Sequence, residues 1–581
     1  MELAAGFTPT TRDDWRELAA AVLRRSGIEA GSPEEALSTP TYDGLTIAPL
    51  YDLDDLPGDP GLPGAPPYVR GARTAPRWDV RQRHAAPDPE AVLADLENGV
   101  TSLWLVVGDG AIPPEALADV LKDVLLDLAP VVLEAGPRTR EAAEALLALA
   151  AERGVAVSGN LGGSGAAGAE LAVRCAAGFP GLRAVTVDAT RWHDAGGGDA
   201  DELGCSIARG VAELRELTEA GLPVEQALGQ IEFRYAATDD QFATVAKLRA
   251  ARRMWARVAE VCGAPEHGGQ RQHAVTSSAM MTVRDPYVNL LRTTVACFAA
   301  GVGGADAVTV QPFDAALGLP DAFSRRIARN TQALLLEEAH LARVLDPAGG
   351  SWYVERRTAD LAERAWAWFQ EIEAAGGADA AGELIAARVA ATRERRAADI
   401  ARRRFPITGV SEYPDLGERP VRRSGEGIAT PRHAEEFEAL RDLAESRPER
   451  PKVFLATIGP VAAHTARAAF AANLFQAGGF ATETAGPGAD PEQIATAFAI
   501  SGARVACLCS SDRLYAEHAA PVAAALRRAG ARRVWLAGQG GHEGVDGVDG
   551  VDGTVHAGCD ALHVLRTTYD DVLGDDLGVT R

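Results

Sequence analysis

His193 is the residue of this sequence whose type and setting best suit chemistry. It ends the stretch Asp188-Ala189-Thr190-Arg191-Trp192-His193, directly after a run that predicts a buried strand. An imidazole titrates near neutral pH, so it can hydrogen-bond a carbonyl group or move a proton. The other titratable groups nearby are Asp194 and the carboxylates of 199–202. His193 is therefore a weak catalytic candidate, and a purely polar histidine at the end of a strand remains the alternative.

Other reactive residues are sparse. The seven cysteines are scattered, form no zinc-type CxxC pair, and are predicted to be buried, reduced thiols. Lysine occurs only at Lys122, Lys247 and Lys452. The helix and strand patterns around Lys247 and Lys452 give no sign of a catalytic setting, so Schiff-base chemistry has few candidates.

Eight strand-like runs separated by helical patterns would position these residues. The runs are 79–82, 102–107, 130–134, 155–158, 183–188, 231–236, 272–278 and 305–311. Such alternation predicts an α/β protein with a parallel sheet, and eight units fit a TIM-type (β/α)8 barrel, in which chemistry lies where strands end. An open doubly wound sheet would require a G-x-G-x-x-G turn. Gly162-Gly163-Ser164-Gly165 does not match that motif and is interpreted as a loop after the fourth strand.

A second, smaller series of βα units follows residue 451. Its predicted strands are 452–457, 481–485, 504–509, 533–537 and 554–556. Five short strands with intervening helices predict a flavodoxin-like doubly wound parallel sheet, which binds ligands beyond the carboxyl ends of its strands. The Val-Asp-Gly repeat at 545–553 lies between the last two strands, and we assign it no role.

The remaining segments complete four predicted regions. Residues 1–76 are an N-terminal helix with an extended Pro/Gly-rich arm, and 77–394 form the barrel. Residues 395–450 are a linker without a periodic core signal, and 451–581 form the second domain. Thr11 and Asp14 resemble a capping box before an amphipathic helix. That helix packs either on its own barrel or on a partner subunit.

Composition limits the class of protein. At 581 residues the chain is expected to hold two or three domains, and its net charge of −23 argues against non-specific nucleic-acid binding. No apolar run is long enough to span a membrane, and the first residues lack a signal-peptide pattern, so we expect a cytoplasmic protein.

Several stretches of the barrel region resemble the methylmalonyl-CoA mutase family. They are AKLRAAR (246–252), DPYVNLLRTT (285–294), FSRRIARNTQ (323–332) and DPAGGSWYVE (346–355). The resemblance runs from Tyr51 to the C-terminal helix. It implies a barrel followed by a cobalamin-binding domain, and an isomerase that interconverts (R)-methylmalonyl-CoA and succinyl-CoA by adenosylcobalamin radical chemistry.

The barrel departs from the pattern of active family members. The loop that carries a substrate-covering tyrosine in those members is reduced here to Ala72-Arg73-Thr74-Ala75-Pro76. Trp192-His193 occupies the place of an aromatic–histidine pair that serves the thioester carbonyl. Arg271 and His273 match an R-x-H pair near the cofactor, but Asp306 and Ala315 stand where the family has a glutamine and a glutamate.

The second domain departs further. The family's D-x-H-x-x-G motif supplies the lower axial ligand to cobalt, and an upstream lysine supports it. The lysine position is Thr457 here, the aspartate Val461, the histidine Ala463 and the glycine Ala466. His464, one residue late, is a weak candidate for a metal ligand. A shift of one helical residue turns a side chain by roughly 100°.

The resemblance is therefore to small (beta) subunits of heterodimeric members, which do not bind cobalamin. It implies a large (alpha) partner subunit that holds adenosylcobalamin and the acyl-CoA substrate, with no cofactor on this chain. Two alternatives remain: a scaffold or chaperone for cobalamin loading, and an independently active acyl-CoA mutase-like isomerase with a modified site.

Overall fold

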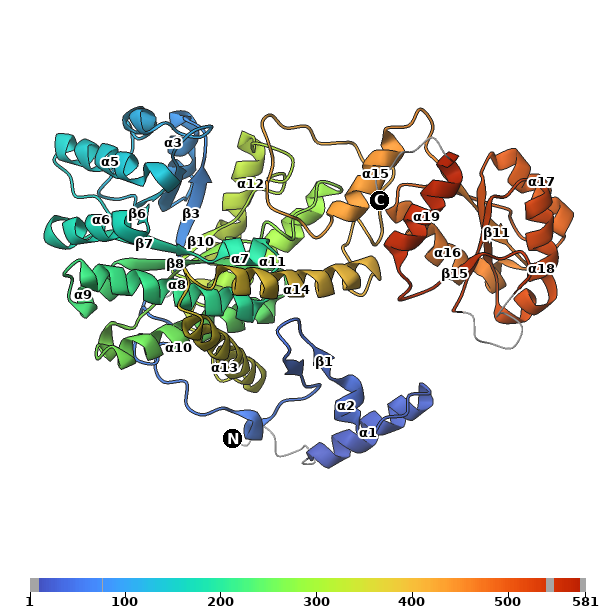
Figure 1. Cartoon of the computed structure of the whole chain (residues 1–581), viewed down its shortest axis with the longest axis horizontal. Coiled ribbons are helices and arrows are strands. Elements are labelled where there is room, and N and C mark those ends of the chain that lie inside the picture. The colour runs from blue at the N-terminus through green and yellow to red at the C-terminus, as the bar shows by residue number, and fades with distance from the viewer. Residues whose placement is uncertain (1–9, 76, 540–547, 575–581) are drawn as a thin grey trace.

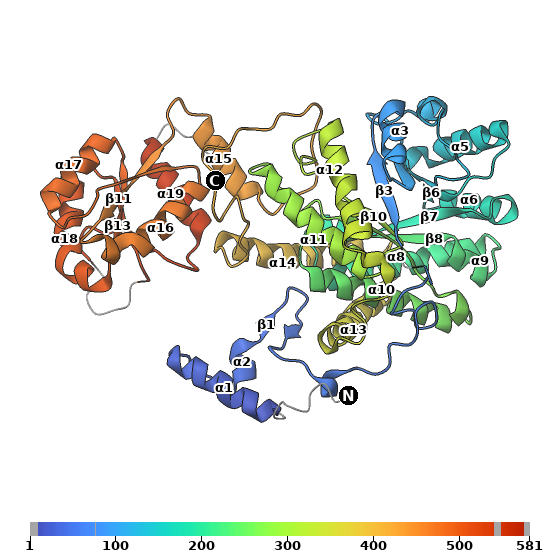
Figure 2. The same ribbon diagram turned by 180° about the vertical axis from the view of Figure 1, so that it is seen from behind.

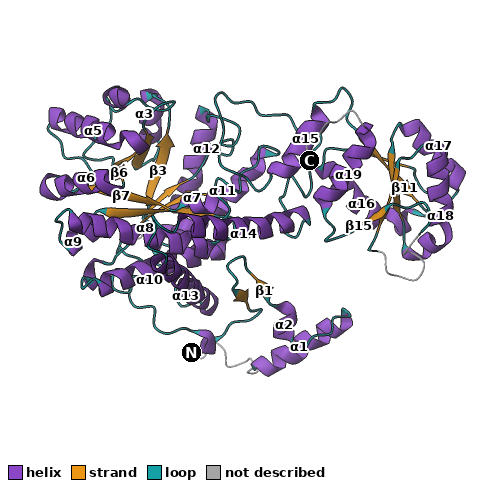
Figure 3. Cartoon of the chain, viewed as in Figure 1, coloured by secondary structure: helices purple, strands orange, loops and turns teal. Residues whose placement is uncertain are grey.

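The computed structural model describes residues 10–75, 77–539 and 548–574. A large barrel and a smaller α/β domain lie side by side, and the segment around helix α15 lies between them (Figure 1). The N-terminal helices lie against neither domain along most of their length in the two opposite views (Figures 1 and 2). The sheets of both domains are enclosed by helices (Figure 3).

The larger domain is a closed barrel of eight parallel strands in sequential order. The strands are β3 (Asp79–His84), β4 (Ser102–Val106), β5 (Val131–Glu134), β6 (Gly159–Gly163), β7 (Leu182–Asp188), β8 (Ile231–Ala237), β9 (Arg271–Thr276) and β10 (Ala307–Thr309). β10 pairs with both β9 and β3, which closes the barrel. The predicted (β/α)8 barrel is confirmed.

Helices form the outer layer of the barrel. They are α3 (Pro89–Glu97), α4 (Leu117–Val120), α5 (Thr139–Arg153), α6 (Gly165–Gly178), α7 (Thr190–Asp194), α8 (Asp199–Glu219), α9 (Val224–Gly229), α10 (Gln241–Val261), α11 (Asn289–Val302) and α12 (Ala322–Ala333). Two further helices, α13 (Trp352–Ala374) and α14 (Gly382–Ala401), follow, and α13 packs on α8 and α10.

The fourth barrel strand lies later than the sequence predicts. Gly162 and Gly163 belong to β6, and Gly165 begins α6, so the predicted loop at 162–165 and the predicted strand at 155–158 are both wrong. Glycine is required because a Cβ on Gly159 would lie 1.9 Å from the Val131 carbonyl oxygen, and one on Gly162 would lie 2.0 Å from that of Leu133. Close backbone approach therefore explains a glycine-rich strand that reads as a loop.

Ion pairs fill much of the barrel interior. Arg81 of β3 donates to Glu232 of β8 at 2.7 Å, and both side chains are buried. Arg234, also on β8, reaches Asp188 of β7 at 2.7 Å and Glu134 of β5 at 3.1 Å. The Arg234 guanidinium also lies 4.0 Å from the ring centroid of Trp104. The Arg81–Glu232 and Arg234–Glu134 pairs join strands that are not neighbours, so side chains occupy the barrel axis.

The smaller domain is a five-stranded parallel sheet in the order β12-β11-β13-β14-β15. Its strands are β11 (Lys452–Thr457), β12 (Ala481–Thr484), β13 (Val505–Cys509), β14 (Arg533–Ala537) and β15 (Gly553–Val555), with helices α16 (Val461–Ala477), α17 (Pro491–Ser501), α18 (Asp512–Arg528) and α19 (Ala561–Leu573). This order is the flavodoxin-like one, as predicted. The first Val-Asp-Gly triplet lies outside the described residues. In the last, Asp552 accepts from the Val534 N–H at 2.7 Å and pairs with Arg527.

The N-terminal arm begins with α1 (Arg12–Arg25), whose predicted capping box between Thr11 and Asp14 is present. α2 (Pro33–Leu37) and a hairpin of β1 (Thr39–Pro40) and β2 (Thr46–Ile47) follow. Leu18 and Val22 on the apolar stripe of α1 are 71% and 59% exposed. Leu23 on the same helix is buried, whereas Leu18 and Val22 do not pack on the barrel of the same chain.

The predicted linker at 395–450 contains an unpredicted packed element. Helix α14 extends to Ala401, and α15 (Glu435–Glu445) buries Phe437, Leu440 and Ala444. The expectation of no core signal before Lys452 was wrong, because the apolar stripe of α15 is short and interrupted by buried charges.

Both domains hold α15 in place. On the barrel side, its Glu438 accepts from the Val283 N–H at 2.7 Å, and Arg284 pairs with Glu445 at 2.8 Å. On the other side, the Tyr569 hydroxyl of α19 donates to the Leu440 carbonyl at 3.0 Å. The predicted linker thus includes a helix that bridges the two domains.

The cysteines are unpaired throughout the described chain. Five are buried as predicted, whereas Cys262 is exposed and Cys559 half-buried. None of the helices in 10–75, 77–539 and 548–574 has the length and apolar run needed to cross a membrane.

Candidate functional site

His193 lies where the sequence places it, in the short helix α7 at the carboxyl end of β7. Its Nε2 lies 2.7 Å from the Ser277 hydroxyl beyond β9, and its Nδ1 lies 3.9 Å from Glu202. Its side chain is buried. Burial, reinforced by the positive charge of Lys247, holds the pKa of His193 well below its ordinary value. The imidazole is therefore neutral, which allows it to bond Ser277 but makes it a poor proton donor.

A buried charged cluster lies behind His193. Lys247 of α10 donates to Glu202 at 2.7 Å and lies 3.0 Å from Asp199. Asp43, from the turn of the N-terminal hairpin, accepts from the Ala200 N–H at 2.8 Å. Burial, and then repulsion by Asp199, raises the pKa of Asp43 to about 7. Sequence reasoning missed Lys247 because its helical pattern does not show which partners α8 brings to it.

A cavity of about 570 Å³ lies at the carboxyl ends of the barrel strands. Residues at or just beyond the carboxyl ends of β3, β4, β5, β7, β8, β9 and β10 line it, together with 426–430 from the segment between the domains. Ser277 and Asp194 line this cavity. Among the residues that the structure describes, His193 is not part of the lining. A molecule in the cavity would therefore meet Ser277 in front of His193.

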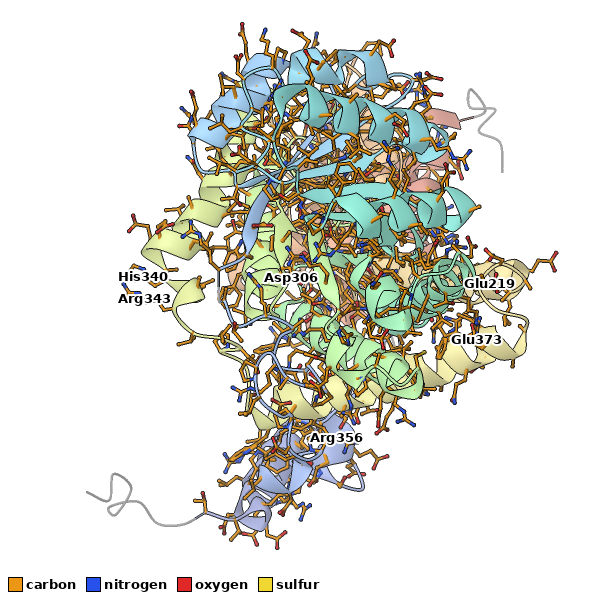
Figure 4. The ribbon with its side chains drawn as sticks, turned by 90° about the vertical axis from the view of Figure 1, so that its left-hand side faces the viewer. Glu219, Asp306, His340, Arg343, Arg356 and Glu373 are labelled. Atoms are coloured by element: carbon orange, nitrogen blue, oxygen red, sulfur yellow. The ribbon has the colours of Figure 1, made fainter. Side chains whose placement is uncertain are left out.

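Two of the barrel positions that the family resemblance places near the cofactor lie away from the barrel mouth. Arg271 begins β9 and Asp306 precedes β10, so both lie at the amino-terminal end of the barrel. Asp306, labelled near the centre of Figure 4, accepts from the Gln272 N–H at 2.7 Å and pairs with Arg73 at 3.3 Å. His273 lies inside the barrel with its Nε2 2.8 Å from the Thr309 hydroxyl. These three residues hold the barrel together and do not form one site.

The motif positions of the second domain gather at the carboxyl end of β11. Thr457 ends the strand and donates its hydroxyl to the Gly486 carbonyl at 2.7 Å. Val461 begins α16 and is 58% exposed, and Ala463 and Ala466 follow on the same helix. The loop before the helix is pinned by Gly459, whose N–H donates to the Gly488 carbonyl at 2.7 Å.

His464 lies in the first turns of α16 and is only 8% exposed. It shares a helix face with Ala471 and Phe475, which belong to the core between α16, α19 and the sheet. Both ring nitrogens lack a hydrogen-bond partner among the described residues. The imidazole therefore points to the core side of the helix, where it cannot reach a ligand placed above Ala463.

Cobalamin, which the fold implies, does not fit this donor set. An axial ligand needs an imidazole directed at the metal and a second group that orients it. Ala463 and Val461 supply neither, and His464 is directed elsewhere. No group of three or more His, Cys, Asp or Glu side chains suited to a metal occurs in the part of the chain that the structure describes.

A closed (β/α)8 barrel followed by a 2-1-3-4-5 parallel sheet defines a two-domain α/β protein. Residues 165–477 match the family model described as Methylmalonyl-CoA mutase. The chain belongs to the methylmalonyl-CoA mutase family.

Relatives with small-subunit names cover nearly the whole chain. The Methylmalonyl-CoA mutase small subunit of Streptomyces virginiae is 55% identical over 98% of both chains. That of Propionibacterium freudenreichii subsp. shermanii is 40% identical over 99% of this chain and 96% of its own. By contrast, the Methylmalonyl-CoA mutase of Escherichia coli (strain K12) is 31% identical over 69% of this chain and 64% of its own.

Proposed function

We propose that this chain is the non-catalytic small subunit of a heterodimeric, adenosylcobalamin-dependent methylmalonyl-CoA mutase. Its large partner subunit binds the cofactor and the acyl-CoA substrate and carries out the interconversion of (R)-methylmalonyl-CoA and succinyl-CoA. The chain described above shapes and stabilises that partner. The complex is an isomerase (an intramolecular transferase), and this chain is inactive alone.

The observation that carries the proposal is the replacement of the residues of the D-x-H-x-x-G motif in the second domain. Ala463 stands at the ligand position, and the neighbouring His464 turns into the core. Losing even an orienting partner typically weakens a metal site about 10–100-fold. Losing the ligand itself removes the bond, so the cofactor requires another chain.

The barrel supports the same conclusion. His193 is neutral, buried and bonded to Ser277, so it is poorly placed for proton transfer. Ion pairs such as Arg81 with Glu232 occupy the barrel axis. A fold is thus retained while its chemistry is not.

The exposed stripe of α1 supports a partner. Leu18 and Val22 remain in contact with solvent, and helix α1 extends away from the barrel (Figures 1 and 2). Exposed apolar side chains on one face of an amphipathic helix are typical of an interaction surface. We assign this surface to the large subunit.

Cobalamin content, measured by visible absorbance, tests the proposal. The chain is purified alone and after co-expression with a large subunit that carries an intact D-x-H-x-x-G motif. We expect cobalamin and mutase activity only in the pair. Tight binding by the isolated chain contradicts the proposal, and transfer of cobalamin without stable pairing supports a loading chaperone instead.

A further inference from the structure

A flavodoxin-like sheet binds its ligand in a crevice at the edge where the strand order reverses. In the second domain this crevice lies beyond the carboxyl ends of β11 and β13. The helix that follows β11 is α16, and the helix that follows β13 is α18. These two helices lie on opposite sides of the sheet (Figure 1). A ligand in the crevice would therefore lie between the start of α16 and the start of α18.

The hydrophobic cores confirm which face each helix covers. Leu474 and Phe475 of α16 pack in the core that contains Leu455. Tyr515 of α18 packs in the core that contains Phe454. Phe454 and Leu455 are adjacent on β11, so their side chains point to opposite faces of the sheet. A side chain that joins the first turns of α16 and α18 must consequently cross the carboxyl edge of the sheet.

Arg467 is such a side chain. It lies in the second turn of α16, and its Nη1 donates to the Ser510 carbonyl at 2.7 Å. Its Nη2 pairs with Asp512, the first residue of α18, at 2.6 Å. The guanidinium carbon also lies 5.1 Å from the centroid of the Tyr515 ring. Arg467 is therefore held across the crevice, from the helix on one face to the helix on the other.

The guanidinium of Arg467 also covers the end of the next strand. β14 ends at Ala537, and a Cβ on the following residue, Gly538, would lie 3.3 Å from the guanidinium carbon. A contact at that distance is tighter than ordinary van der Waals contact, so glycine leaves the room that the arginine takes up. Arg467 thus lies over the carboxyl ends of both β13 and β14.

The loops beneath Arg467 are joined to one another without a ligand. The Ser510 hydroxyl, which is fully buried, donates to the Ile458 carbonyl at 2.8 Å and connects the end of β13 to the end of β11. On the other side of β11, Gly459 and Gly488 exchange two backbone hydrogen bonds, at 2.7 and 3.2 Å. Backbone groups at this edge, which a ligand would otherwise meet, therefore already have partners within the domain.

We propose that the Arg467 bridge, the contacts of Arg467 with Ser510 and Asp512, is an autoinhibitory contact that closes the ligand crevice of the second domain. The inference rests on the proposed function, in which the partner holds cobalamin, and it names what keeps a cofactor out of this chain. Exclusion then depends on occupation of the crevice as well as on the lost ligand at Ala463. The Arg467 and Asp512 side chains are 29% and 41% exposed, and an ion pair at such exposure adds little stability, so Arg467 can be replaced without unfolding the domain.

Restoring the family motif tests whether Arg467 is a separate barrier. The restored full chain carries Thr457→Lys, Val461→Asp, Ala463→His and Ala466→Gly, and a second version adds Arg467→Ala. Visible absorbance follows the titration of each with adenosylcobalamin. We expect the version with Arg467→Ala to bind about tenfold more tightly or better, because the cofactor no longer has to displace a guanidinium from its charge-assisted hydrogen bond. Equal affinities, or no binding by either version, overturn the inference.

Arg513→Ala in the restored chain is the matched control. Arg513 is exposed and follows Asp512 on α18, so this change removes the same charge beside the crevice and leaves the Arg467 bridge in place. It should alter the affinity by less than about twofold, and circular dichroism should show every variant folded. A gain as large as that of Arg467→Ala would make the effect one of charge alone and would contradict closure of the crevice.

Thiol labelling tests the closure without a cofactor. Ser510→Cys places a thiol on a fully buried side chain whose backbone carbonyl is bonded to Arg467. Mass spectrometry of peptides separates iodoacetamide labelling at position 510 from labelling at the exposed Cys262. Adding Arg467→Ala should accelerate labelling at position 510 about tenfold or more, because the edge of the sheet opens locally.

Equal labelling rates with and without Arg467 overturn the inference, even where the restored chains do not fold. Tight binding of cobalamin by the unaltered isolated chain contradicts the proposed function instead. The two comparisons between Arg467 and alanine concern only the closure of the crevice, so the two failures are distinguishable.

Discussion

Lys247 and Glu202 lie 2.7 Å apart, and neither side chain has any exposed surface. The pair joins α10 to α8 behind the barrel mouth, and Asp199 gives the ammonium group a second partner at 3.0 Å. A buried pair of this kind contributes little net stability while complete, but removing one partner leaves an uncompensated charge.

Lys247→Met should therefore lower the free energy of unfolding by about 3–5 kcal/mol. Chemical denaturation followed by circular dichroism measures the change. The double variant Lys247→Met with Glu202→Gln should recover part of the loss, because the carboxylate of Glu202 is then removed and only Asp199 is left without its partner. Lys122→Met, at an exposed pair, is the control and should have almost no effect. If Lys247→Met lowered the free energy of unfolding as little as Lys122→Met, the assigned pairing would be contradicted.

Asp43 should make the attachment of the N-terminal hairpin depend on pH. Its folded pKa of about 7 lies above the ordinary value of 3.8, so the folded state holds the proton longer than the unfolded state. The stability from the neutral carboxyl is complete below pH of about 4 and is lost as pH rises through about 7.

Asp43→Asn keeps the acceptor for the Ala200 N–H and removes the charge beside Asp199. We expect this variant to exceed the wild type by about 2 kcal/mol at pH 8 and by much less at pH 5. Melting temperatures at both pH values measure the difference. Asp54→Asn, exposed in the same arm, is the control and should show no difference in stability at either pH. A stability effect of Asp43→Asn that does not depend on pH would argue against the titration of Asp43.

His193→Gln should leave the reconstituted mutase with more than half of its kcat/KM. Glutamine can still bond Ser277, and burial disfavours the imidazolium form that would act as a general acid. Steady-state kinetics of the pair measures this. General acid–base residues contribute typically about 10²–10⁴-fold, so a loss of about a hundredfold in a folded variant would make His193 catalytic.

His464→Leu should raise the free energy of unfolding of the second domain by about 1 kcal/mol, because it removes two buried nitrogens without partners. The cobalamin content of the pair should stay the same. Denaturation and visible absorbance measure the two quantities. His563→Leu, exposed on α19, serves as the control and should have little effect. Loss of cobalamin in the His464 variant would assign the imidazole to the cofactor.

Gly162→Ala should destabilise the barrel by roughly 3 kcal/mol or more, since its Cβ would overlap the Leu133 carbonyl and its φ is +69°. Gly178→Ala, where no atom lies within 4 Å, should be neutral or slightly stabilising. Thermal unfolding compares the two. Equal stability would place β6 elsewhere in the sequence.

The sequence predicts the order and type of most elements because hydrophobic periodicity is local. Seven of the eight barrel strands and all five strands of the second sheet lie within a few residues of their predicted positions. β6 was misplaced because its glycines are selected by the backbones of neighbouring strands, which no local pattern reveals. α15 was missed because its buried Glu438 and Arg441 interrupt the apolar stripe.

The site was less predictable than the fold. Exchanges such as Ala463 can be identified by resemblance, but the direction of His464 depends on where α16 begins. A signal for the charged barrel interior was nevertheless present. Arg81 and Arg83, like Glu232 and Arg234, are two residues apart on one strand and therefore point to the same side.

The pair of Arg81 and Glu232 also sets a condition on synthesis. The two residues are 151 positions apart, so Arg81 leaves the ribosome long before its counterion Glu232 has been synthesised. At about 5–20 residues per second, β3 waits many seconds with a charge that cannot be buried alone. The first half of the barrel therefore cannot complete its packing while the chain is still being synthesised. We expect chaperones that hold nascent chains to bind this protein until β8 has emerged.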